Sequence, residues 1–327
     1  MAASYPNGSH NNAPSLFEQK PLDIYWANAQ FWINTQTEVV MLTDFLSPII
    51  GDWPVAVRWA ALGGVVFALI AVRYFLVASA GFGLSTLLGK IAPWRKLQNR
   101  DFSRQQITRE IAYSMLSTLI FVTVVGLIFI MTSAGWTQLY TDPYAYGLVW
   151  LILQVPAVLL IQDFYFYWMH RIIHEPEFYD RVHKTHHLST NPSPFSAFAF
   201  HPFEAVLEIA IFLVLVFIIP LHAIALITAG LLSLVYNVYG HLGYEVMPRF
   251  LANSPLGYWL NKSAYHNQHH RTYRYNYGLY TVIWDRLYGT LHPKADQLYD
   301  QATQKPEPEP ASFSHGKSIS PATRPDS

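Results

Sequence analysis

The apolar stretch of this chain from Ile111 to Met131 contains 21 residues and no charged side chain. As an α-helix it would measure about 31 Å, enough to cross the roughly 30 Å of hydrocarbon in a bilayer. Trp59 to Ala80 and Tyr144 to Met169 are two further apolar stretches. Only 13% of the 327 residues are charged, whereas about a quarter is usual in soluble domains. The sequence therefore predicts an all-α integral membrane helical bundle.

A fourth apolar stretch, from Ala205 to Tyr239, is divided by Pro220. Each arm would be about 22 Å long as a helix, which is short for a full crossing. We expect a helical hairpin that enters the membrane and returns, in addition to about three spans. Residues 1–54 are expected to form a polar tail with a possible interfacial segment, residues 55–292 the membrane domain, and residues 293–327 a disordered tail.

The basic residues are distributed unevenly around these stretches. Residues 81–110 contain six lysines and arginines, whereas residues 132–143 contain none. Basic loops are enriched on the cytoplasmic side, so we expect residues 81–110 in the cytoplasm. The third span and the hairpin then both return the chain to that side. The membrane would be the endoplasmic reticulum in a eukaryote and the plasma membrane in a bacterium.

Ten of the fourteen histidines gather in a part of the chain where those returns are expected. They form one H-x-x-x-H motif, two H-x-x-H-H motifs and two single positions between them. Helix positions i, i+3 and i+4 share a face, and neutral imidazole binds iron, zinc or copper. Ten nitrogens exceed a tetrahedral zinc site and suit two ions with about five each. The predicted metal ligands, in a cap on the cytoplasmic face, are His170, His174, His183, His186, His187, His201, His241, His266, His269 and His270.

Other kinds of site are disfavoured. The chain has no cysteine, which excludes disulfides, cysteine-ligated zinc and iron–sulfur clusters. It has no basic run suited to nucleic acid, and it has no P-loop and no glycine-rich nicotinamide motif, so we do not expect it to take electrons from NAD(P)H by itself. His174-Glu175 lacks the second histidine of a zinc protease helix. A histidine-rich metal transporter or sensor is the alternative of another class, and it should place its ligands within the spans.

The residues around the histidines resemble those of the sterol desaturase/fatty acid hydroxylase family of membrane di-iron oxidases. The likeness covers residues 104–292 and is greatest to the C-5 sterol desaturase (lathosterol oxidase) branch. It rests on four motifs: Asp163-x-x-x-Tyr167-Trp168-x-His170-Arg171-x-x-His174, VHKTHHLSTNPSPFSAFAFHPFEA from Val182, NVYGHLGYEVMP from Asn237, and HNQHHRTYRYNYGLYTVIWDRLYGT from His266.

This resemblance implies two iron ions, O2 as co-substrate and a membrane lipid as substrate. C-5 desaturation of a sterol is the favoured reaction, while hydroxylation of a sterol C-4 methyl group, an acyl chain or an alkylglycerol chain stays open. The external donor would be cytochrome b5, ferredoxin or a similar protein with its reductase.

Three further side chains are expected near the ligands. Asp163 precedes His170 by two helical turns, and Glu204 follows His201 by three residues, so either carboxylate could orient a ligating imidazole. Asn237, four residues before His241, stands at a spacing that in acyl desaturases lets an asparagine reach the metal through water. Asp285, beside Arg286, is expected to form a local salt bridge.

Overall fold

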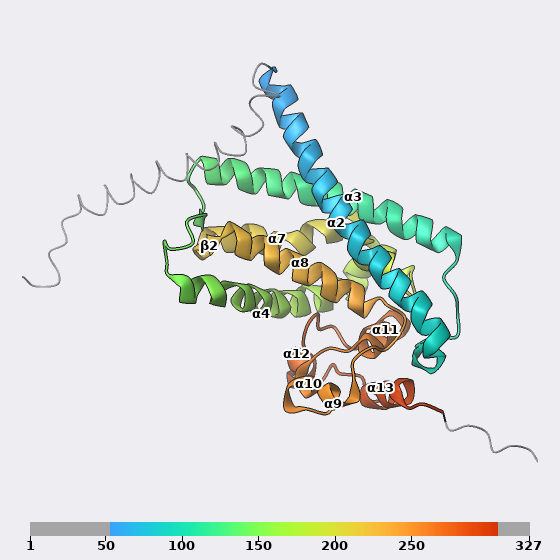
Figure 1. Cartoon of the computed structure of the whole chain (residues 1–327). Helices are drawn as coiled ribbons and strands as arrows, with labels where there is room; N and C mark the ends of the chain where they lie inside the picture. Colours follow the sequence, from blue (N-terminus) through green and yellow to red (C-terminus); the bar gives the residue numbers. More distant parts are fainter. Residues whose placement is uncertain (1–52, 307–327) are drawn as a thin grey trace, which may run out of the picture.

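Four long helices form the membrane part of the computed structural model, which describes residues 53–306 (Figure 1). By length and composition each could cross a membrane. They are α2 (Val55–Ile91), α3 (Arg104–Ser133), α4 (Leu148–Ile173) and α8 (Ala223–Gly240). The predicted helical bundle and its three apolar stretches are thereby confirmed. The expected interfacial segment lies in residues 1–52, outside the described part of the chain.

The predicted hairpin corresponds to α7 (Pro202–Ile218) and α8, which follow one another through the turn at Pro220 (Figure 1). Pro220 lies in the turn, and its carbonyl accepts a hydrogen bond from Trp150 Nε1 at 2.9 Å. The next residues form β2 (Leu221–His222), which pairs in parallel with β1 (Leu139–Tyr140). At about 27 Å, α8 is longer than the arm expected from the sequence, so it counts as a fourth candidate span.

Helix α2 crosses the other membrane helices diagonally (Figure 1). Glycine and alanine let the helices approach closely at such a crossing because they carry little or no side chain. At Gly81, a Cβ atom would lie 2.6 Å from Val238 Cγ1 in α8 and 3.3 Å from Pro194 Cβ. The core at this crossing contains Tyr74, Ala78, Phe121, Ala197, Phe198, Phe200, Ala205, Leu234 and Val238.

Short elements form a cap at one end of the bundle. They are η1 (Pro93–Arg95), α5 (Pro176–Phe178), η2 (Tyr179–His183), α6 (Lys184–His187), η3 (Pro194–Phe198), α9 (Arg249–Ala252), α10 (Pro255–Trp259), α11 (Ser263–Thr272), α12 (Ile283–Leu287) and α13 (Ala295–Thr303). Leu97 N donates to Gly243 O at 3.0 Å, and Glu245 N donates to Arg95 O at 2.9 Å. The basic segment between α2 and α3 therefore contacts the cap, as the charge distribution predicts.

The end of the domain differs from the expectation. Helix α13 contacts the cap through the buried Tyr299, whose hydroxyl donates to Met247 O at 3.1 Å. A disordered tail beginning at residue 293 is therefore wrong for residues 293–306. Their few apolar side chains suffice because the cap already offers an apolar surface to them. Residues 307–327 lie outside the described part.

We predict that Gly81→Ala lowers the free energy of unfolding by about 1–3 kcal/mol, because the added methyl group overfills the contact with Val238. Thermal unfolding in detergent measures the change. Gly83→Ala is the matched control, since nothing lies within 4 Å of a Cβ atom there. Equal stability of the two variants would contradict the close crossing of α2 and α8.

Candidate metal centre

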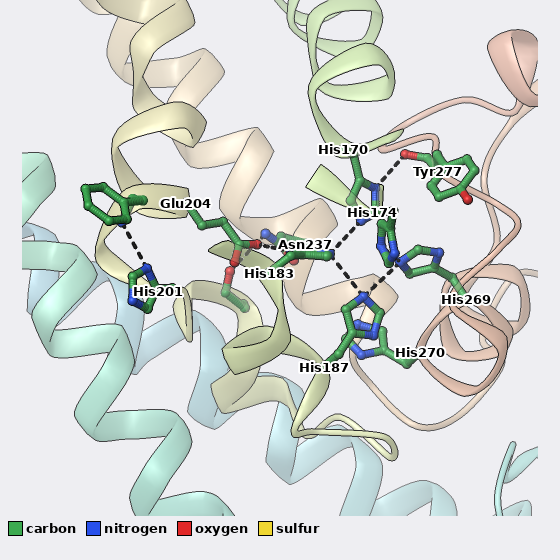
Figure 2. Close-up of polar contacts among 12 residues, drawn as sticks. His170, His174, His183, His187, His201, Glu204, Asn237, His269, His270 and Tyr277 are labelled. Carbon is green, nitrogen blue, oxygen red and sulfur yellow. Dashed lines mark hydrogen bonds and ion pairs between the residues drawn. The ribbon is translucent and has the colours of Figure 1, made fainter. Parts of the chain in front are cut away.

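Nine of the ten predicted ligands lie in two groups at the cap end of the bundle (Figure 2). Within each group the ring nitrogens lie within 4.8 Å of one another. The first group contains His170, His174, His183, His187 and His269. The second group contains His186, His241, His266 and His270. Only His174 is half-buried, and the other eight rings are buried. The predicted pair of metal sites thus has a structural counterpart.

The two H-x-x-H-H motifs are interlocked. His183 and His187, at positions i and i+4, both face the first group, whereas His186 faces the second. In α11 the arrangement is reversed, since His266 and His270 face the second group and His269 faces the first. Residues four apart lie on one side of a helix, while the preceding residue is rotated away by about 100°. Each motif therefore contributes to both groups.

The ring nitrogens are spaced like ligands of a common ion. His183 Nε2 lies 3.0 Å from both His170 Nε2 and His187 Nε2, and His266 Nε2 lies 3.1 Å from His241 Nε2. Ligand nitrogens about 2.1 Å from one ion lie about 3.0 Å apart at right angles and about 3.4 Å apart in a tetrahedron. The spacing fits a five- or six-coordinate ion better than a tetrahedral one.

Hydrogen bonds at the opposite nitrogen fix the proton positions of four rings. His170 Nδ1 donates to Tyr277 O at 2.9 Å, and His269 Nδ1 donates to Tyr275 O at 2.6 Å. His241 Nδ1 donates to Asn237 O at 2.7 Å. A carbonyl oxygen only accepts, so Nδ1 carries the proton and Nε2 keeps a free lone pair.

His183 is fixed in the same way by a carboxylate. Its Nδ1 lies 2.6 Å from Glu204 Oε1, and Glu204 is fully buried. The lone pairs of His170, His183 and His269 thus point into one buried space. Converging lone pairs repel one another unless a cation lies between them, and this is the arrangement that a metal site requires.

Burial keeps these rings neutral. It lowers the pKa of His241 to about 4 and the pKa of His174 far below its ordinary value. It also lowers the pKa of six further histidines that lie outside the membrane helices, and neighbouring imidazoles act in the same direction; these are His183, His186, His187, His266, His269 and His270. A neutral imidazole can donate its lone pair to a metal, so the electrostatics favour ligation.

The structure does not bring His201 into either group. Its side chain caps α7, with Nδ1 accepting from Phe203 N at 3.4 Å. Figure 2 shows it on the far side of Glu204 from the other labelled histidines. His201 precedes Pro202 at a helix start, and this capping position turns the ring away from the groups.

The other three candidates have different roles from one another. Glu204 contacts His183 as expected. Asn237 reaches His241 through its backbone carbonyl, while its side-chain Nδ2 donates to Ala197 O at 2.9 Å. Asp163 contacts no histidine. Its carboxylate accepts from Tyr280 N at 2.7 Å and from Trp284 Nε1 at 3.0 Å, and so ties α4 to the segment after α11.

That segment, residues 273–281, is the part of the site that the sequence does not reveal. It presents the carbonyls of Tyr275 and Tyr277 to His269 and His170. Asp285 holds it by accepting from Tyr277 N at 2.9 Å and Gly278 N at 2.8 Å. The expected salt bridge of Asp285 with Arg286 is wrong, since the Arg286 guanidinium lies 3.7 Å above the Tyr258 ring. The turn signal Asn276-x-Gly278 marks the segment, but not the direction of its carbonyls.

A bundle of apolar helices with nine histidines, eight of them buried, in two groups at one end defines a membrane protein with a candidate two-metal centre. Residues 155–290, which include all nine, match the model of the fatty acid hydroxylase family. Over these residues the chain is similar to this family, and the likeness, together with its sterol desaturase relatives, indicates an oxidoreductase.

Curated relatives include sterol desaturases. The chain is 29% identical over 298 residues to the Delta(7)-sterol 5(6)-desaturase erg3A of Aspergillus fumigatus, covering 88% of this chain and 79% of that protein. It is 30% identical over 197 residues to human lathosterol oxidase, covering 60% of this chain and 64% of that protein. The mouse lathosterol oxidase is 32% identical over 203 residues, with shares of 61% and 66%. No solved structure matches the chain.

We predict that Asp285→Asn loosens residues 273–281, because an amide presents hydrogens where the carboxylate accepts from two backbone N–H groups and Thr290. The free energy of unfolding should fall by about 1–3 kcal/mol, and amide hydrogen exchange should quicken in this segment. Asp300→Asn is the control, since its ion pair with Arg249 at 3.6 Å is exposed and is worth about 0–1 kcal/mol. Unchanged exchange in Asp285→Asn would contradict the anchoring role.

Proposed function

We propose that this protein is an O2-dependent di-iron oxidoreductase that desaturates a membrane sterol between carbons 5 and 6. The convergence of nine neutral imidazoles into two buried groups is the observation that carries the proposal. The names of the relatives, Delta(7)-sterol 5(6)-desaturase and lathosterol oxidase, support the sterol and the position. The ligand positions, at the ends of the helices instead of within the spans, argue against a transporter.

The donor set suits two iron ions. All nine donors are imidazole nitrogens, which bind ferrous iron and leave positions open for a further ligand. The Nδ1 atoms of His186, His187 and His270 are buried and have no hydrogen-bond partner within residues 53–306. In His187 and His270 the opposite nitrogen, Nε2, faces a neighbouring imidazole at 3.0 and 3.2 Å and is the atom that would bind the metal. The first group would hold one iron and the second group the other.

The iron pair, when bound, activates O2 for hydrogen abstraction from an unreactive C–H bond. Desaturation removes two hydrogen atoms from the lipid, and one O2 becomes two waters with two further electrons and two protons. The chain supplies orientation and a dry environment. Glu204 fixes the tautomer of His183, and the Tyr275 and Tyr277 carbonyls fix His269 and His170.

The apolar core at the α2 crossing adjoins the second group. Phe200 belongs to that core, and its ring centroid lies 5.2 Å from that of His186. A lipid approaching from the membrane side would therefore meet the second group. The half-buried His174, in the first group, lies toward the polar surface. We propose that this surface faces the cytoplasm, because the basic segment between α2 and α3 contacts it.

We predict that His186→Asn loses at least one of two irons and lowers turnover by at least about 100-fold. His201→Asn is the matched control, because asparagine still caps a helix and His201 lies outside both groups. It should keep both irons and most of the activity. Elemental analysis and turnover of the purified proteins measure both effects. This assignment of ligands would be contradicted if His186→Asn kept two irons, or if His201→Asn lost iron.

We predict that expression in a host without C-5 sterol desaturase converts a Delta(7)-sterol into a product lighter by two hydrogen atoms. Mass spectrometry of the extracted lipids measures it, with His186→Asn as the inactive control. The fatty acid hydroxylase match keeps hydroxylation as a second candidate, and its product would be heavier by one oxygen atom. A sterol fraction identical to that of the control would exclude both sterol reactions.

A further inference from the structure

A hollow of about 200 Å³ lies on the outer surface between the start of α3 and the segment after α6. Arg100 and Arg109 line one side of it, and Leu188, Thr190 and Asn191 line the other. Arg109 Nη2 donates to Ser189 Oγ at 3.3 Å, which joins the two sides. No residue that lines the hollow belongs to either histidine group.

The hollow reaches close to both histidine groups. Leu188 follows directly on His186, of the second group, and His187, of the first. Its side chain is 48% exposed, whereas both histidines are buried. Leu188 thus connects the surface of the hollow, through the chain, to candidate ligands of both groups. An electron arriving at this surface has a short covalent path to either group.

The charge at the hollow is positive and uncompensated. Arg100 and Arg109 line the hollow and Arg104 lies next to its lining residues Ser103 and Gln105; the three arginines form no ion pair within residues 53–306. Asp101 also lines the hollow, but it is paired with Lys96 at 2.6 Å. Arg100 and Arg104 are exposed. A cluster of one sign of charge attracts partners of the opposite sign and speeds their encounter.

The surface around the half-buried His174 is the competing approach, and its charges are mixed. Glu175, Glu177 and Asp180 are exposed there beside Arg181, and Lys184 is paired with Asp180 at 2.8 Å. A surface of mixed charge does not strongly favour a partner of either net charge. The basic hollow is therefore the better match for a partner of net negative charge.

We propose that the hollow and its three arginines form the docking surface for a one-electron carrier protein with an acidic face. This inference rests on the proposed function, since desaturation consumes two electrons per O2. Two reduced carriers, docking in turn, would each give one electron to the iron centre and leave oxidised. An anionic lipid headgroup is the other chemistry the arginines could bind, and the experiment separates the two.

The experiment uses the iron-loaded full chain in nanodiscs, with cytochrome b5 and ferredoxin as probes. The probe to follow is the one that supports turnover of the unaltered chain. The double variant Arg100→Glu/Arg104→Glu should bind this probe more weakly, and kcat/KM for the probe should fall by about 10-fold. Turnover with dithionite as reductant should stay unchanged. For the unaltered chain, kcat/KM for the probe should fall steeply as salt rises, and for the double variant only weakly. Arg181→Glu is the control on the competing surface and should change binding less than about twofold.

Several outcomes would overturn the docking surface. One is that Arg181→Glu weakens probe binding as much as the double variant does. Another is that both probes bind the double variant as tightly as the unaltered chain. A third is that, in nanodiscs containing anionic lipid, the double variant loses only its retained anionic lipid and no probe binding. Probe binding is measured without substrate, so it stays informative whatever the reaction. Absence of dithionite-driven turnover in the unaltered chain would instead count against the proposed function and leave the binding result standing.

Discussion

At one end of the bundle, imidazole lone pairs point toward one another, and the rest of this structure depends on this interaction. His170 and His269 give their Nδ1 protons to backbone carbonyls, so their Nε2 lone pairs must face inward. His183 does the same through Glu204. In a low-dielectric interior such groups are costly unless a cation satisfies them. The two groups could therefore hold metal ions, and the irregular backbone of the cap aims carbonyls at their ring nitrogens.

The membrane helices supply the rigidity that this scaffold needs. His170 lies in the last turn of α4, and His241 caps α8, so two ligands come from ends of membrane helices. The hairpin returns the chain so that these two ends meet on one side. Buried acids then fix the remaining segments. Glu245 accepts from Ala264 N at 2.9 Å in the first turn of α11, and thereby places the helix that carries His266, His269 and His270.

The sequence allows the spans, the hairpin, the shared side and nine of the histidines to be predicted, because these follow from apolar length, charge and helical spacing. The division of the nine into two groups could not be predicted. It depends on how α6 and α11 rotate toward each other, which is set by tertiary contacts. The position of His201 could not be predicted either, because a histidine before a proline can cap a helix or bind a metal, and the sequence does not distinguish the two roles. For Asp163, the spacing placed it on the face of His170, but it binds the N–H groups of Tyr280 and Thr281 instead.

The two groups differ in their surroundings, and this difference bears on how one centre serves two kinds of reactant. His186, in the second group, faces the ring of Phe200 and an apolar core at the α2 crossing. His187, the next residue, faces the first group and the Tyr273 ring at 4.8 Å. His186 and His187 are adjacent residues of the short helix α6, and they face the apolar side and the polar side respectively. The two groups are therefore joined directly through this helix. In the proposed reaction, a lipid would reach the centre from within the membrane and electrons would enter through the aqueous surface, so neither reactant would have to cross the path of the other.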